Sequence, residues 1–361
     1  MTRAKLDRVL IVMMSAIGDA VHTLPVVTAI KRFKPDARIT WVLQPGPAEL
    51  VRGHPDVDEI LIFRRKPPLR AFWELRKQLA GRRYDVVLNL QVYLKGGLVS
   101  TLVRAPIKLG FDRSRARDLN WMFTTHRIPK HAPQHVQDQY LEFLEWMNVP
   151  QPFSPNPAEL PPASAWNLGP WDAERAMQRE FFATFERPTV PIVVATSKPG
   201  KDWLPERWTD VCNHLYADFG LQPVLVGGRS PRELAAERVV LDGAKVPVVS
   251  ALGSGLRKLV GILDGSALAI SPDTGPLHAS VAIDRPVIAL MGCTNPKRVG
   301  PYRRFRDLMI DAYGDPGEDY PINMEFRQGR MERIRAKDVL EKVQVWARTY
   351  RASHPARGLG V

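Results

Sequence analysis

The chain alternates short apolar runs with amphipathic stretches, and this pattern occurs twice. In the first half, the apolar runs are residues 8–15, 38–44, 59–63 and 85–91. Two helical stretches lie between them, one that ends near Arg32 and one over residues 71–79. The second half repeats the pattern, with helical periodicity at 208–219 and 336–348 and apolar runs at 191–197, 222–228, 267–273 and 286–292. Strands that alternate with helices predict α/β domains with parallel, doubly wound sheets.

A proline-rich segment separates the two halves. Residues 150–162 (PQPFSPNPAELPP) contain six prolines, which neither a helix nor a central strand accommodates. We therefore predict an N-terminal Rossmann-like domain over 1–160, a second over 161–335, and a C-terminal helix and tail over 336–361. Ligands of such domains commonly bind at the carboxyl ends of strands, so we expect a central cleft between the two parallel sheets.

The composition is that of a soluble globular protein, with 45% hydrophobic and 25% charged residues among 361. No apolar run approaches the roughly 18 residues that a membrane-spanning helix needs. The two cysteines, Cys212 and Cys293, are too few and too far apart to indicate a disulfide framework or a metal site. We expect a protein of the reducing cytoplasm.

Positive charge is concentrated in two stretches of the first half. The formal net charge is +13; residues 64–83 contain eight Lys or Arg and one Glu, and residues 104–130 contain seven Lys or Arg and two Asp. This concentration indicates a partner with clustered negative charge, although a solvated, solubilising surface is the alternative interpretation of any single stretch.

Two loops that follow predicted strands contain candidate functional residues. Asp19 follows the first strand in SAIGD and lies near a helix start, where a carboxylate is also a common cap. Because Pro25 is best accommodated in a first helical turn, Thr23 is a second candidate for the N-cap, which would leave Asp19 in the loop. In TSKPGKDW, Lys198 and Lys201 flank a Pro-Gly turn, and either could bind a phosphate or remain solvated.

Two further loops resemble nucleotide-binding turns. Glu233 follows Gly227-Gly228 and is either a ligand of the nucleotide or a first-turn helix residue. In the segment 271–302, Asp273 and Thr274 are expected to bond backbone N–H groups, and the helix after Gly275 is a candidate anion site that His278 could also reach. An aspartic protease needs two such Asp-Thr-Gly triplets, and this chain has one.

Asp56 and Asp58 resemble the Asp-x-Asp pair that binds a metal diphosphate in some sugar transferases. They directly precede an apolar run, so we interpret them as a strand-entry turn and predict no obligatory metal and no cofactor.

Four motifs in this order make the sequence resemble the ADP-heptose:lipopolysaccharide heptosyltransferases of glycosyltransferase family 9. They are VLIVMMSAIGDAVHTLPVVTAIKRFKPDARITWVLQP, HPDVDEILIF, KDWLPERW and DTGPLHASVAIDRPVIALMGCTNPKRVGPY. The resemblance implies a GT-B fold, in which the first domain binds the acceptor and the second binds the nucleotide-sugar. The region 314–335 lacks the cysteine pair of some relatives, which leaves the subgroup and the acceptor open.

The resemblance also implies roles for individual residues. Asp19 is similar to the catalytic base, Lys201 to the lysine at the donor diphosphate, and Glu233 to the residue at the ribose. The remaining donor-binding residues implied by the motif are Asp273, Thr274, Gly275 and His278. The implied reaction inverts the anomeric centre, with Lys201 and the backbone N–H groups around residues 274–276 stabilising the departing ADP.

The implied donor is ADP-heptose, and the implied acceptor is Kdo-lipid A or the lipopolysaccharide core. Arg64, Arg65 and Lys66 are the candidates for binding this anionic acceptor, at the cytoplasmic face of an anionic inner membrane. The alternatives are another nucleotide-activated sugar with another polysaccharide, or a nucleic-acid-binding protein, although no recognition motif accompanies the charge. An NAD-dependent oxidoreductase is disfavoured because SAIGD lacks the Gly-x-Gly-x-x-Gly spacing.

Overall fold

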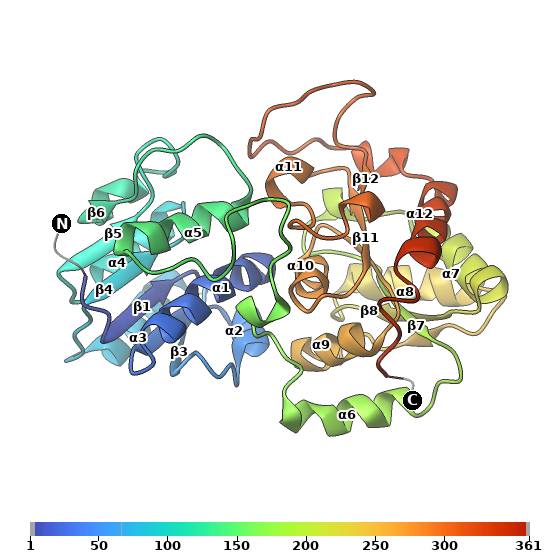
Figure 1. Cartoon of the computed structure of the whole chain (residues 1–361), viewed down its shortest axis with the longest axis horizontal. Coiled ribbons are helices and arrows are strands. Elements are labelled where there is room, and N and C mark those ends of the chain that lie inside the picture. Colours follow the sequence, from blue (N-terminus) through green and yellow to red (C-terminus); the bar gives the residue numbers. More distant parts are fainter. Residues whose placement is uncertain (1–3, 66, 359–361) are drawn as a thin grey trace. The chain divides into compact units, whose positions relative to one another are not determined.

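The computed structural model describes residues 4–65 and 67–358, and these fold into two compact units with the boundary between Asn167 and Leu168 (Figure 1). The proline-rich segment 150–162 therefore belongs to the first unit, whose last short helix, η2, spans Ala163–Ala165. The predicted domain boundary at residue 160 lies just before that helix. The second unit includes the C-terminal helix α12 (Ala336–Thr349), which packs against α7 (Pro205–Phe219) of the same unit.

The first unit contains a six-stranded parallel sheet in the order β3-β2-β1-β4-β5-β6. Its strands are β1 (Arg8–Val12), β2 (Arg38–Leu43), β3 (Glu59–Ile62), β4 (Val86–Asn89), β5 (Ile107–Gly110) and β6 (His126–Arg127). Its helices are α1 (Ile17–Phe33), α2 (Pro45–Val51), α3 (Pro68–Leu79), α4 (Leu94–Thr101), α5 (Val136–Met147) and the 3-10 helix η1 (Asn120–Phe123). In this doubly wound order the chain reverses its direction of winding between β1 and β4.

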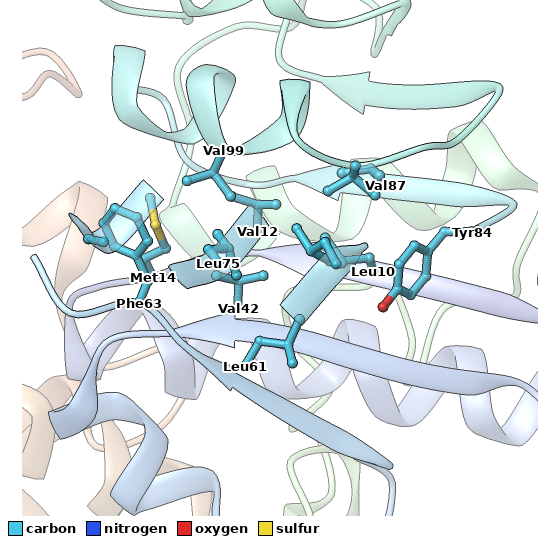
Figure 2. Packing of buried hydrophobic residues seen from close by; sticks show 13 residues of the cluster. Leu10, Val12, Met14, Val42, Leu61, Phe63, Leu75, Tyr84, Val87 and Val99 are labelled. Carbon is cyan, nitrogen blue, oxygen red and sulfur yellow. The ribbon is translucent and has the colours of Figure 1, made fainter. Parts of the chain in front are cut away.

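The core of the first unit fills the space between the sheet and the helices α3 and α4. Leu10 and Val12 project from β1 toward Leu75 of α3 and Val99 of α4, as Figure 2 shows. The other face of the sheet is covered by α1, which packs against α5. Both faces are thus buried, which explains why the strands read as continuous apolar runs rather than as alternating ones.

The second unit repeats this topology with the strand order β12-β11-β10-β7-β8-β9, again entirely parallel. Its strands are β7 (Thr189–Val193), β8 (Gln222–Val226), β9 (Val249–Ser250), β10 (Ala269–Pro272), β11 (Val287–Met291) and β12 (Ile310–Asp311). Its other helices are α6 (Asp172–Phe182), α8 (Pro231–Gly243), α9 (Leu256–Gly265), α10 (Gly275–Ala282), α11 (Pro296–Val299) and the 3-10 helices η3 (Pro199–Lys201), η4 (Arg306–Leu308) and η5 (Arg330–Arg333). The reversal here lies between β7 and β10, so β7 and β10 occupy the places that β1 and β4 have in the first unit.

The two predicted parallel sheets are confirmed. Across residues 4–65 and 67–358, none of the helices is long and apolar enough to cross a lipid bilayer. Cys212 and Cys293 are both buried as free thiols, and burial raises the pKa of Cys212 to about 12.

Candidate active site

Asp19 lies in the first turn of α1, immediately after the loop that follows β1. Its Oδ2 accepts a hydrogen bond from the backbone N–H of Ala16 at 2.8 Å, and its Oδ1 accepts one from the hydroxyl of Tyr140 at 3.1 Å. The alternative N-cap at Thr23 is wrong, because the helix begins at Ile17 and continues through Pro25. Burial of the helix from Ala20 to Ile30 offsets the backbone hydrogen bond that a proline removes.

The loop before Asp19 is held by residues that follow β4, on the other side of the reversal point. Gln91 Nε2 donates to the carbonyl oxygen of Ser15 at 2.8 Å. The carbonyl of Gln91 in turn accepts from Asn120 Nδ2, and Asn120 Oδ1 accepts from Asn89 Nδ2 at 2.9 Å. The reversal point of a doubly wound sheet is the usual place for a ligand, and in this unit Asp19 and Gln91 follow the two strands on either side of it.

Arg64 and Arg65 are exposed directly after β3, at the same carboxyl edge of the sheet as Asp19. Lys66 lies outside the described residues. Lys95, at the start of α4, has its pKa lowered by burial and, to a smaller extent, by the positive charge of Arg65. Arg115, from the second basic stretch, is instead paired internally with carboxylates.

In the second unit, Lys201 and Asp273 form an ion pair across the reversal point between β7 and β10. Lys201 Nζ lies 2.5 Å from Asp273 Oδ2 and 3.3 Å from the Asp273 carbonyl oxygen. The hydroxyl of Thr294 donates to the same Oδ2 at 2.6 Å, and His278 Nε2 lies 3.2 Å from Oδ1 as a donor to the carboxylate. The structure therefore brings together three of the predicted donor-binding residues and adds Thr294.

The electrostatics of Asp273 follow from these contacts. Burial by itself would raise the pKa of Asp273, but the positive charge of Lys201 and the bond from His278 outweigh burial and hold it below its ordinary value. Asp273 is 7% exposed and His278 is 6% exposed, so both are largely withdrawn from solvent. The Asp273 carboxylate is thus an anion at neutral pH, and it holds the ammonium group of Lys201 in place.

Two expectations for this loop are corrected. Asp273 accepts from side chains rather than from the backbone N–H groups of the following helix, because Lys201 reaches it from η3, in the loop after the neighbouring strand β7. Within the described part of the chain, the side chain of Thr274 makes no capping hydrogen bond to α10. Pro276 has no N–H, so the backbone donors of the turn belong to Thr274 and Gly275.

Glu233 occupies the first turn of α8 and organises the glycine turn after β8. Its Oε1 accepts from the N–H of Gly228 at 2.6 Å and its Oε2 accepts from the N–H of Ser230 at 2.8 Å. Gly227 in this turn has a φ of +154°, a conformation that L side chains rarely adopt, so the turn favours glycine at that position. The carboxylate caps the helix, and its predicted role at the ribose stays a prediction.

Asp58 precedes β3 at the amino edge of the sheet, away from the loops described above. Its Oδ2 accepts from the N–H of Ile39 at 2.7 Å and lies 3.0 Å from Lys31 Nζ, as a strand-entry residue should. Among the residues that the structure describes, no three His, Cys, Asp or Glu side chains cluster as metal ligands do. That the reaction needs no metal stays a prediction.

Sequence reasoning missed Thr294, Gln91 and Tyr140. Thr294 and Gln91 each closely follow a strand adjacent to a predicted site loop, which was the available signal. Tyr140 lies in α5, more than a hundred residues from Asp19 in the sequence, and no local pattern relates the two.

The fold is that of the GT-B glycosyltransferases. A glycosyltransferase of family 9 from Veillonella parvula superposes with a TM-score of 0.75 at 20% identity, covering 94% of this chain and 97% of that one. The Escherichia coli heptosyltransferase WaaC, solved with ADP, superposes with a TM-score of 0.71 at 24% identity, covering 94% and 99%. At these identities the likeness concerns the fold.

The sequence comparisons then give the family. Residues 72–313 match the family described as glycosyltransferase family 9 (heptosyltransferase), and the chain belongs to this family. The lipopolysaccharide core heptosyltransferase OpsX of Haemophilus influenzae is 27% identical over 93% of both chains. Lipopolysaccharide heptosyltransferase 1 of Escherichia coli K12 is 29% identical over 82% of this chain and 91% of its own. The predicted family and its enzyme class are confirmed.

Proposed function

We propose that this protein transfers a heptose from ADP-heptose to the Kdo/heptose inner core of lipopolysaccharide, with inversion at the anomeric carbon and without a metal ion. The family supports the reaction class, and its relatives are named for lipopolysaccharide heptosyl transfer. The observation that supports the proposal most directly is the buried Lys201–Asp273 pair at the reversal point of the second sheet. It presents a fixed cation where an α/β sheet usually binds its ligand.

We assign the binding of the ADP-heptose donor to the second unit. An ammonium group has three N–H donors; two of those of Lys201 are directed to Asp273, and we assign the third to an oxygen of the ADP diphosphate. The N–H groups of Thr274 and Gly275 at the start of α10 add fixed dipoles. As the bond between the anomeric carbon and the β-phosphate oxygen breaks, its electron pair moves to ADP, and these groups stabilise the growing charge.

We assign the catalytic base and the binding of the acceptor to the first unit. Asp19 takes the proton from an acceptor hydroxyl while that oxygen forms the new bond to the anomeric carbon, opposite the leaving group. The N–H of Ala16 and the hydroxyl of Tyr140 fix the orientation of the carboxylate, and each carboxylate oxygen keeps a further lone pair for the incoming proton. Arg64 and Arg65 are assigned to the anionic groups of the acceptor, which the protein meets at the cytoplasmic face of the inner membrane.

The decisive experiment incubates the full chain with labelled ADP-heptose and Kdo-lipid A in the presence of EDTA. The wild type should transfer heptose despite the chelator, whereas Asp19→Ala should lose at least about a hundred-fold in rate, which is the usual contribution of a general base. The matched control is Asp36→Ala, an exposed carboxylate of the same unit, which should retain full activity. An active Asp19→Ala variant would contradict the assigned base, and strict dependence on a metal would contradict the account of the leaving group.

A second variant tests the acceptor site. Arg64→Glu combined with Arg65→Glu should raise the KM for Kdo-lipid A and leave the affinity for ADP unchanged, because both residues lie in the unit that is assigned the acceptor. Acceptor kinetics equal to those of the wild type would assign the two arginines to solubility instead.

A further inference from the structure

Helix α3 presents apolar side chains on two opposite faces. One face is packed into the core of the first unit through Ala71, Leu75 and Leu79. On the outward face, Leu69 is 88% exposed and Trp73, one turn later, is 56% exposed. Scattered surface apolar residues need no explanation, but a leucine and a tryptophan at i and i+4 form a continuous apolar stripe.

This outward stripe is bordered by cations. Arg76 and Lys77 are exposed on either side of it, and Arg70 is exposed with its Nε 2.7 Å from Glu74 Oε1. Lys77 Nζ lies 3.5 Å from the centroid of the Trp73 ring, which is a cation–π contact on the surface of the helix. By sequence, residues 64–83 hold eight Lys or Arg against one Glu. The surface thus combines an aromatic and an aliphatic side chain with a surplus of positive charge.

These properties match the interface of an anionic lipid bilayer. Tryptophan is enriched at the headgroup level, and lysine and arginine extend their charges to the phosphates while their stems remain in the apolar layer. Each basic residue close to an anionic lipid surface adds about five-fold to binding. Nucleic acid would satisfy the charges but not Leu69, and Lys77 covers the Trp73 face on which a base would stack.

We propose that the outward face of α3, comprising Leu69, Arg70, Trp73, Arg76 and Lys77, docks on an anionic lipid bilayer. Leu69 and Trp73 enter the headgroup layer, and the cations contact the lipid phosphates. The inference rests on the proposed function in one respect, because a lipid-borne acceptor gives the protein a reason to bind a membrane. The exposure and the charges of α3 do not depend on that function.

The test measures co-flotation of the full chain with vesicles of phosphatidylcholine alone and with vesicles of equal parts phosphatidylcholine and phosphatidylglycerol. The wild type should bind the anionic vesicles, and Leu69→Ser combined with Trp73→Ser should weaken binding by about ten- to a hundred-fold, as expected for two partly buried apolar side chains. The matched control is Val239→Ser with Leu241→Ser, two apolar residues exposed on α8 that should leave binding unchanged.

A separate measurement tests whether Trp73 enters the lipid bilayer. Lipids brominated in the acyl chain should quench part of the tryptophan fluorescence of the wild type, and Trp73→Phe should lose this quenching while it still binds the vesicles. Quenching that persists in Trp73→Phe would overturn the assignment of this face. Equal weakening of vesicle binding in the α8 control would also overturn it. The same holds if the protein binds a DNA duplex through Leu69 and Trp73 and does not bind vesicles.

The docking surface and the proposed function fail in different assays. With a deacylated, water-soluble core acceptor, the Leu69→Ser, Trp73→Ser variant should transfer heptose at the wild-type rate. If the wild type binds vesicles through α3 but transfers nothing from ADP-heptose, the proposed function is wrong and the docking surface stands. If transfer proceeds but the Leu69→Ser, Trp73→Ser variant binds vesicles as the wild type does, the docking surface is wrong and the proposed function is retained.

Discussion

Replacing Asp273 by asparagine should destabilise the second unit strongly, although the two side chains have nearly the same shape. The substitution removes the negative charge that Lys201 contacts at 2.5 Å. The side chains of Asp273 and Lys201 are only 8% and 16% exposed, so water cannot replace the lost partner. Removing one member of a buried ion pair costs about 3–5 kcal/mol, because the remaining charge is left buried without compensation.

This cost translates into a measurable shift in melting temperature. For a domain of the size of residues 168–361, each kcal/mol shifts Tm by about 2–4 °C, so the transition of this unit should fall by roughly 6–20 °C. Calorimetry of the full chain resolves this transition from that of the first unit when the two differ. The control is Asp242→Asn, which breaks the exposed pair with Arg238 and should cost less than about 1 kcal/mol.

A double-mutant cycle tests the reasoning itself. Lys201→Met alone should also destabilise, and the double variant should lose at least about 2 kcal/mol less than the sum of the single losses, because it leaves neither charge uncompensated. If the two losses add to within about 0.5 kcal/mol, the pair is not coupled and the account of the site fails.

Two further predictions concern pH and the loop before Asp19. Because the pKa of Asp273 in the folded state lies below its ordinary value, its contribution to stability is present above about pH 4 and is lost as the pH falls further. Urea midpoints measured through that range should therefore fall less steeply in Asp273→Asn than in the wild type, and parallel curves would contradict the assignment. Gln91→Ala removes the donor to the Ser15 carbonyl and should lower kcat about ten- to a hundred-fold at unchanged KM for ADP-heptose, since it displaces Asp19 without touching the donor. Steady-state kinetics with normal kcat would show that the loop holds its position without Gln91.

The long central elements were predictable because their patterns are unambiguous. The apolar runs that became β1, β2, β7, β8, β10 and β11 are buried on both faces, so composition alone identified them. The edge strands β6, β9 and β12 have two residues each and are in part exposed, so their sequences contain no apolar run from which a strand could be predicted. Helix α1 was predictable in position but not in its start, because the local preference of Pro25 for a first turn is overridden by burial of the whole helix.

The site was predictable as a set of loops and not as a set of contacts. The rule that parallel strands present their carboxyl ends on one edge places Lys201 and Asp273 together, and the strand order then makes them neighbours. No sequence pattern shows that the Asp273 carboxylate turns toward Lys201 and Thr294 rather than toward the backbone of α10. That preference arises because the full charge of Lys201, in the loop after β7, binds a buried carboxylate more strongly than a neutral N–H does.

The ion pair between Lys201 and Asp273 also constrains how the protein can change over generations. A substitution at Asp273 is expected to weaken the fold of the second unit and to release the ammonium group of Lys201 in a single step. Asp19 instead accepts bonds from one backbone N–H at the start of its own helix and from the hydroxyl of Tyr140 in α5, so its substitution should cost the first unit less. On grounds of stability alone, substitutions should therefore be less tolerated at Asp273 than at Asp19.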